Sequence, residues 1–195
     1  MELSLQSYSI SQILARAILR LKSWRLDVNL PVERKYVLVG APHTSNWDFL
    51  YTMLLKYATG IKMHWIGKDT LFRGPVGSVM RALGGIPVKR HSNNNFVQQI
   101  VDTFNRVEEL VVAISPEGTR SNTKYWRTGF YYIALGAGVP IVLGFVDYRE
   151  KVVGIGPALI PSGDIRADFI DIKEFYARKT GKYPEKQGAI EIRPE

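Results

Sequence analysis

The sequence contains no cysteine. This absence excludes disulfide bonds, thiolate metal ligands and a cysteine nucleophile, and it fits a reducing compartment. Histidine is scarce as well. The chain has three, His43, His64 and His91, and no two of them have the helical spacing of a zinc motif. We therefore expect no metal site.

Long apolar runs are also missing. No run is long enough to cross a bilayer, and Arg16 and Arg20 interrupt the apolar residues near the N-terminus, so a signal peptide is not expected. The chain has no Gly-x-Ser-x-Gly motif, no complete dinucleotide fingerprint and no phosphate-binding loop of the Walker type. It has an excess of positive charge instead. The formal net charge of +8 indicates an anionic partner, such as a phosphorylated substrate, an acidic carrier protein, an acidic lipid surface or nucleic acid.

Strand-like and helix-like segments alternate along most of the chain. Apolar runs at 36–39, 63–66, 110–114, 140–146 and 152–155 predict strands, and the segments 47–57, 76–83, 95–109, 129–135 and 164–179 predict helices. This alternation is typical of a single α/β domain whose mostly parallel or mixed central sheet is flanked by helices. In such folds functional side chains gather where strands end and loops begin.

The N-terminal segment predicts an amphipathic helix over residues 9–24. Its apolar positions fall on one face at helical spacing, and they are Ile10, Ile13, Leu14, Ala17, Ile18, Leu21 and Trp24. Basic residues occupy the remainder, which is the pattern of a helix lying on an anionic membrane surface. Packing of this face on the protein's own core is the alternative. We divide the chain into a membrane-surface helix at 1–30 and a catalytic domain at 31–195.

The segment after the first predicted strand places an imidazole and a carboxylate five residues apart. His43 and Asp48 stand where the run 36–39 gives way to a helix that Gly60 should end. A histidine there can remove a proton at neutral pH, and an acid nearby can fix its tautomer. The alternative is local, because Ser45 through Asp48 also fits a helix capping box, in which Asp48 only stabilises the helix start.

Two further loops carry candidate binding groups. Residues 84–91 begin with paired glycines and end in three basic or potentially cationic side chains. Residues 115–121 follow a buried strand and contain Glu117, Gly118 and Arg120. An arginine can grip a phosphate with its two-pronged guanidinium, and a glycine lets the backbone approach closely. A solvated surface role is the alternative for each arginine.

Taken together, four segments resemble the glycerolipid acyltransferase family, typified by 1-acylglycerol-3-phosphate (lysophosphatidate) acyltransferases. They match, in order, the family's His-x4-Asp block at 43–48, its Gly-x4-Arg block at 85–90, its Pro-Glu-Gly-Thr-Arg-Ser block at 116–121 and its Val-Pro strand start at 139–142. Ser115 stands where an aromatic residue often precedes the third block, and Leu143 replaces a second proline of the fourth.

The resemblance implies roles for seven residues. It implies that His43 is the catalytic base and that Asp48 orients it. It further implies that a site for the acceptor's phosphate is formed by Arg90, Glu117, Gly118, Thr119 and Arg120.

These observations predict transfer of a fatty acyl group from a thioester to the hydroxyl of a lysophospholipid such as 1-acylglycerol-3-phosphate. The donor is acyl-CoA or an acyl carrier protein, used as co-substrate without a further cofactor. We expect a peripheral, monotopic enzyme on the cytoplasmic face of a membrane, with no nucleic-acid partner. The alternatives are an acyltransferase for a lyso-lipid without a phosphate, and a non-catalytic binder of anionic membrane or nucleic acid.

Overall fold

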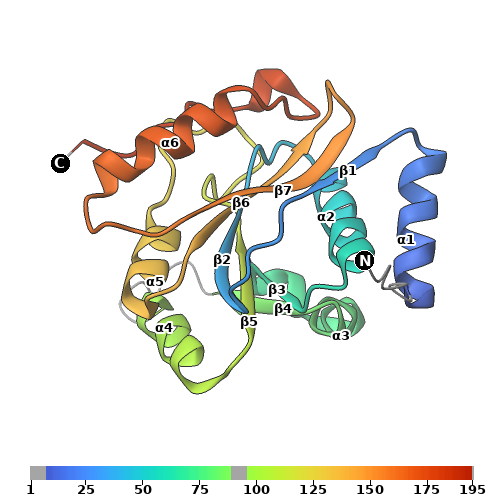
Figure 1. Cartoon of the computed structure of the whole chain (residues 1–195), viewed down its shortest axis with the longest axis horizontal. Helices are drawn as coiled ribbons and strands as arrows, with labels where there is room; N and C mark the ends of the chain where they lie inside the picture. The colour runs from blue at the N-terminus through green and yellow to red at the C-terminus, as the bar shows by residue number, and fades with distance from the viewer. Residues whose placement is uncertain (1–7, 89–95, 195) are drawn as a thin grey trace, which may run out of the picture.

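The computed structural model describes residues 8–88 and 96–194. Its centre is a seven-stranded sheet with the order β1-β7-β6-β2-β5-β3-β4 (Figure 1). The strands are β1 (Arg25–Val28), β2 (Lys35–Gly40), β3 (Met63–Lys68), β4 (Gly85–Val88), β5 (Leu110–Ile114), β6 (Ile141–Asp147) and β7 (Val152–Leu159). All neighbouring strands are parallel except β6 and β7, which form an antiparallel pair. The predicted α/β class with a mixed sheet is therefore confirmed.

Helices cover both faces of this sheet. On one side lie α1 (Ile10–Leu21), α2 (Asn46–Thr59) and α3 (Gly74–Ala82), with the 3₁₀ turn η1 (Asp69–Phe72) between β3 and α3. On the other side lie α4 (Phe96–Arg106), α5 (Gly129–Ala137) and α6 (Ile165–Ala177) (Figure 1). A second 3₁₀ turn, η2 (Pro184–Lys186), lies in the C-terminal segment.

The central strands feed two separate cores because alternate side chains point to opposite faces. In β2, Val37 and Val39 join the core beneath α4, α5 and α6, whereas Tyr36 and Leu38 join the core beneath α1 and α2. Such strands, buried on both faces, read as continuous apolar runs, and this is why the sequence predicted them well.

Two short strands, β1 and β4, were not predicted from the sequence. β1 lies at one edge of the sheet and pairs with β7, and β4 lies at the other edge and pairs with β3. β1 alternates exposed and half-buried residues, and β4 contains a glycine and a proline, so neither has a strong strand pattern. β1 lies within the segment 1–30 that we assigned to the N-terminal helix, so the sheet extends into that segment.

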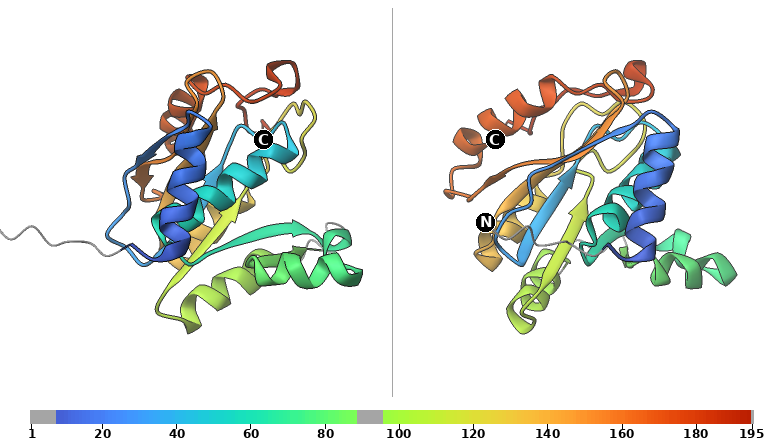
Figure 2. Two further views of the ribbon diagram at one scale, coloured as in Figure 1. Left: turned by 90° about the vertical axis from the view of Figure 1, so that its right-hand side faces the viewer. Right: turned by 45° about the vertical axis from the view of Figure 1, so that its right-hand side comes forward.

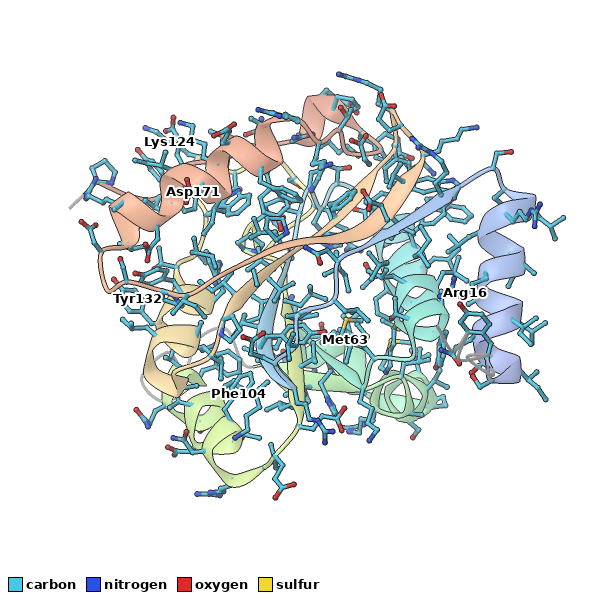
Figure 3. All side chains as sticks on the ribbon, in the orientation of Figure 1. Arg16, Met63, Phe104, Lys124, Tyr132 and Asp171 are labelled. Carbon is cyan, nitrogen blue, oxygen red and sulfur yellow. The ribbon has the colours of Figure 1, made fainter. Side chains whose placement is uncertain are left out.

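The N-terminal helix packs on α2 through a face other than the predicted apolar stripe. Ala15 and Leu19 are buried, and the Arg16 guanidinium donates a hydrogen bond to the carbonyl oxygen of Ala58 at 3.0 Å (Figure 3). α1 lies on the outside of the molecule, next to α2 (Figure 2). The stripe itself is exposed, with Ile10 at 79% and Leu21 at 85%. Trp24, which we placed in this stripe, is instead buried and stacks on Tyr51 of α2.

Within the described residues, no helix combines the length and apolarity needed to traverse a bilayer.

Candidate active site

The loops that follow β2 and β5 meet at one end of the sheet. These strands are parallel neighbours, with Val39 paired to Ile114, so their carboxyl ends lie at the same end of the sheet. The predicted blocks at 43–48 and 116–121 are thereby brought together. A hydrogen bond connects them, from the backbone N–H of His43 to Oε2 of Glu117 at 2.9 Å.

The side chains of His43 and Asp48 face each other. Nδ1 of His43 lies 3.2 Å from Oδ2 of Asp48. The Asp48 side chain is nearly inaccessible, at 5% exposure, whereas the imidazole is 29% exposed and lines a cleft. Because Nδ1 faces the carboxylate, Nε2 is the nitrogen that remains for a substrate. A buried acid behind a partly exposed imidazole is the arrangement of a general-base pair.

Asp48 also caps the helix that carries it. Its Oδ2 accepts the backbone N–H groups of Thr44 and Ser45, each at 2.8 Å, while the Ser45 hydroxyl accepts the N–H of Trp47 at 3.2 Å. The capping box and the pairing with His43 are therefore formed by the same carboxylate. The helix ends at Gly60, which adopts a left-handed conformation at φ +77°.

Backbone N–H groups at the start of α2 are candidates to stabilise an oxyanion beside His43, but two of them already have partners. The N–H groups of Ser45 and Trp47 donate to Asp48 and to the Ser45 hydroxyl. Of the N–H groups at Ser45–Trp47, that of Asn46 has no hydrogen-bond partner among the described residues and is left as a candidate donor.

Glu117 is the second buried acid of the site, with 6% exposure. Burial raises the pKa of its carboxyl from the ordinary 4.5 to about 7, an effect that the hydrogen bond from the His43 N–H and the nearby imidazole only partly offset. Glu117 therefore connects the two loops while its side chain is largely excluded from solvent.

The loop 116–121 turns at Gly118, whose φ of +66° suits glycine. The side chain of Arg127 passes directly over this glycine, so a Cβ at position 118 would lie 2.7 Å from Nε of Arg127. The Arg127 backbone N–H also donates to the carbonyl oxygen of Pro116 at 2.8 Å. Arg127 belongs to none of the motifs that we recognised in the sequence.

A cleft of about 1720 Å³ opens beside the His43–Asp48 pair, which we call the dyad. Part of its lining is apolar and includes Phe49, Met53, Trp65, Leu71 and Met80. Another part carries six cations: Lys68, Arg120, Lys124, Arg127, Arg166 and Arg193. Among residues 8–88 and 96–194, none of these six forms a salt bridge with a carboxylate. A cleft of this kind suits a molecule with a long apolar part and an anionic group.

The predicted binding residues are only partly brought together. Glu117, Gly118, Thr119 and Arg120 all line the cleft. Arg90 lies outside the described residues. The structure adds Tyr148, whose hydroxyl donates to Oδ1 of Asp48 at 2.8 Å and which no local sequence pattern singles out. No group of three or more potential metal ligands occurs in the part of the chain that the structure describes.

A family model described as Acyltransferase matches residues 25–142, more than half of the chain, so the chain belongs to the acyltransferase family. This confirms the resemblance seen in the sequence.

Among solved structures, the chain is similar to the 1-acyl-sn-glycerophosphate (LPA) acyltransferase PlsC from Thermotoga maritima. The TM-score is 0.60 at 16% sequence identity, over 86% of this chain and 76% of that one. The two proteins share a fold.

Glu117→Gln tests the buried acid. Glutamine can accept the His43 N–H but cannot ionise. Between pH 4.5 and 7 the folded wild type holds a proton that the unfolded chain has released, so its free energy of unfolding falls as the pH rises. Relative to the variant, we expect the wild type to lose on the order of 3 kcal/mol across this window.

Urea unfolding at several pH values measures this difference. The exposed Glu185, changed to glutamine, is the control and should leave the pH dependence of the wild type unaltered. Parallel stability curves for wild type and Glu117→Gln would contradict a carboxyl that stays protonated up to neutral pH.

Proposed function

We propose that this acyltransferase moves a fatty acyl group from a thioester to the free hydroxyl of a lysophospholipid such as 1-acylglycerol-3-phosphate. The observation that carries the proposal is the His43–Asp48 pair beside a cleft lined by apolar side chains and by cations that form no salt bridge within the described residues. The structurally similar PlsC is a 1-acyl-sn-glycerophosphate acyltransferase, which agrees with this choice of acceptor.

His43 acts as the general base. Its Nε2 takes the proton of the acceptor hydroxyl as the oxygen attacks the thioester carbonyl, and the Asp48 carboxylate at Nδ1 stabilises the resulting imidazolium. The tetrahedral intermediate then collapses, the C–S bond breaks, and the imidazolium returns the proton to the departing thiolate. No covalent enzyme intermediate is needed, which agrees with a chain that contains no cysteine.

The cationic residues hold the acceptor. Arg120 in the loop after β5 binds the acceptor's phosphate, together with Arg90, and Arg127 over Gly118 adds a further guanidinium close by. Anchoring the phosphate places the hydroxyl against His43. Glu117, Gly118 and Thr119 form the turn that presents Arg120. A lyso-lipid without a phosphate would leave these cations unused.

The donor is acyl-CoA or an acyl carrier protein, and no other cofactor takes part. Both donors are anionic, one through its phosphates and the other through acidic side chains, so both suit a chain with a net charge of +8. The apolar lining of the cleft accommodates the fatty acyl chain.

The exposed stripe of α1 supports a position at a membrane surface. Ile10, Ile13, Leu14, Ile18 and Leu21 are all exposed on the face opposite Ala15 and Leu19, so the protein's own core does not cover them. The exposed basic residues Arg20, Lys22 and Arg25 flank the end of this stripe. An apolar face with cationic flanks suits an anionic bilayer, and we place the enzyme there as a peripheral protein on the cytoplasmic face.

His43→Ala tests the general base. We expect kcat to fall by about 10²- to 10⁴-fold, because the hydroxyl proton loses its acceptor while the binding groups stay in place. Release of free thiol from acyl-CoA in the presence of 1-acylglycerol-3-phosphate measures the rate. The exposed His64, changed to alanine, is the control and should retain full activity. Near wild-type turnover by His43→Ala would end the base assignment.

Arg120→Ala tests the phosphate site. We expect kcat/KM for 1-acylglycerol-3-phosphate to fall at least tenfold, since a charge-assisted contact to the phosphate is lost, while KM for the acyl donor stays unchanged. Monoacylglycerol, which lacks the phosphate, should be used equally poorly by variant and wild type. An unaltered acceptor dependence, or a wild type that prefers monoacylglycerol, would reassign the acceptor.

Leu14→Glu combined with Leu21→Glu tests the membrane face. Both side chains are exposed, so the fold should persist, but sedimentation with vesicles that contain an anionic phospholipid should fall at least tenfold. Ile170→Glu is the matched control, because Ile170 is an equally exposed apolar residue on α6, on the far side of the sheet (Figure 1). Equal loss of binding in both variants would show that any exposed apolar residue suffices.

A further inference from the structure

Tyr148 lies in the turn between β6 and β7, beyond the segment 25–142 that matches the acyltransferase family. It is one hundred residues away from Asp48 in the chain, yet its hydroxyl donates a hydrogen bond to Oδ1 of that carboxylate at 2.8 Å. Burial, and then the Asp48 carboxylate, raise the pKa of Tyr148 well above its usual value, so the hydroxyl keeps its proton and acts as a donor.

The two oxygens of Asp48 have different partners. Oδ2 faces three donors, namely the His43 imidazole and the backbone N–H groups of Thr44 and Ser45. Oδ1 receives the Tyr148 hydroxyl and, among the described residues, no other hydrogen bond from the protein. Because Asp48 is only 4% exposed, losing this donor would leave one oxygen of a buried carboxylate without its partner.

Tyr148 is itself held from two directions. The edge of its ring meets Trp24, which follows α1, at 5.1 Å between centroids, and Tyr51 of α2 at 5.7 Å, both nearly perpendicular. Trp24 and Tyr51 are stacked on each other at 3.9 Å. The Tyr148 backbone N–H donates to the carbonyl oxygen of Thr180 at 2.9 Å. The hydroxyl therefore has little freedom to leave Asp48.

We propose that Tyr148 is a positioning residue for the dyad: its hydroxyl holds Oδ1 so that Oδ2 stays directed at Nδ1 of His43. The inference rests on the function proposed above, in which this pair removes the acceptor's proton. Tyr148 touches no reacting atom. It acts through Asp48, in the way that partners of a catalytic acid fix the orientation of the imidazole.

Tyr148→Phe removes the hydroxyl and keeps the ring against Trp24 and Tyr51. We expect kcat to fall about tenfold, the effect of one hydrogen bond to a charged group, with KM for donor and acceptor unchanged. Tyr36→Phe is the matched control. Tyr36 is a buried tyrosine of the same core whose hydroxyl is not bonded to Asp48, so its loss should leave kcat as in the wild type.

A second measurement follows the dyad without substrate. The contact with Asp48 protects the Nδ1–H proton of His43 from exchange with water, and its downfield NMR signal is assigned by its absence in His43→Ala. In Tyr148→Phe we expect this proton to exchange with water at least tenfold faster, whereas Tyr36→Phe should keep the wild-type rate. A purely structural role would lower thermal stability without changing this exchange.

The outcomes separate the two proposals. Unchanged kcat and unchanged proton exchange in Tyr148→Phe, with an inactive His43→Ala, would overturn the positioning role and leave the general-base assignment intact. An active His43→Ala would overturn the proposed function, and faster exchange in Tyr148→Phe would then still establish the link from Tyr148 to the dyad. A rise in KM with kcat unchanged would assign Tyr148 to substrate binding and overturn the inference.

Discussion

The buried carboxylate of Asp48 is the group on which the rest of the site depends. It accepts backbone N–H groups at the start of α2, faces the imidazole of His43 and receives the Tyr148 hydroxyl. A carboxylate this deeply buried is tolerable only when its oxygens are hydrogen-bonded. The same contacts that make it tolerable also fix the helix start and the imidazole, so local folding and the geometry of the dyad cannot be separated.

The sheet supplies the second half of the site because of the order of its strands. β2 lies between β5 and β6, so the loops after β2 and β5 and the hairpin after β6 leave the sheet close together. These three connections carry His43, Glu117 and Tyr148. On α6, the Tyr176 hydroxyl lies 2.8 and 3.0 Å from the carbonyl oxygens of Val39 and Gly144, which ties this helix to the end of β2 and the middle of β6.

The sequence predicted those parts of the structure that depend on residues close together in the chain. The buried strands could be predicted because they are continuous apolar runs. The contact of His43 with Asp48 could be predicted because five residues at a strand-to-helix junction leave few possible geometries. Tyr148 was not, since its contact with Asp48 exists only once the strands are ordered. The apolar stripe of α1 was recognised, but the sequence left open whether it faces a membrane or the core. In the structure α1 docks through Ala15 and Leu19, the stripe is exposed, and only Trp24 enters the core. The spacing of apolar residues in a sequence shows which face of a helix is apolar. It does not show what that face packs against.

The placement of charge argues for how the cleft discriminates between its ligands. Its two acids, Asp48 and Glu117, are both buried and bonded to the backbone at 43–45, whereas its arginines and lysines carry no paired carboxylate in the described chain. Burial also raises the pKa of Glu117 to about 7, so near neutral pH that acid carries only part of its negative charge. Under the proposed function, an entering phosphate meets cations without a competing surface acid among the described lining residues. The Asp48 carboxylate lies behind His43, where it would stabilise an imidazolium and does not face the ligand.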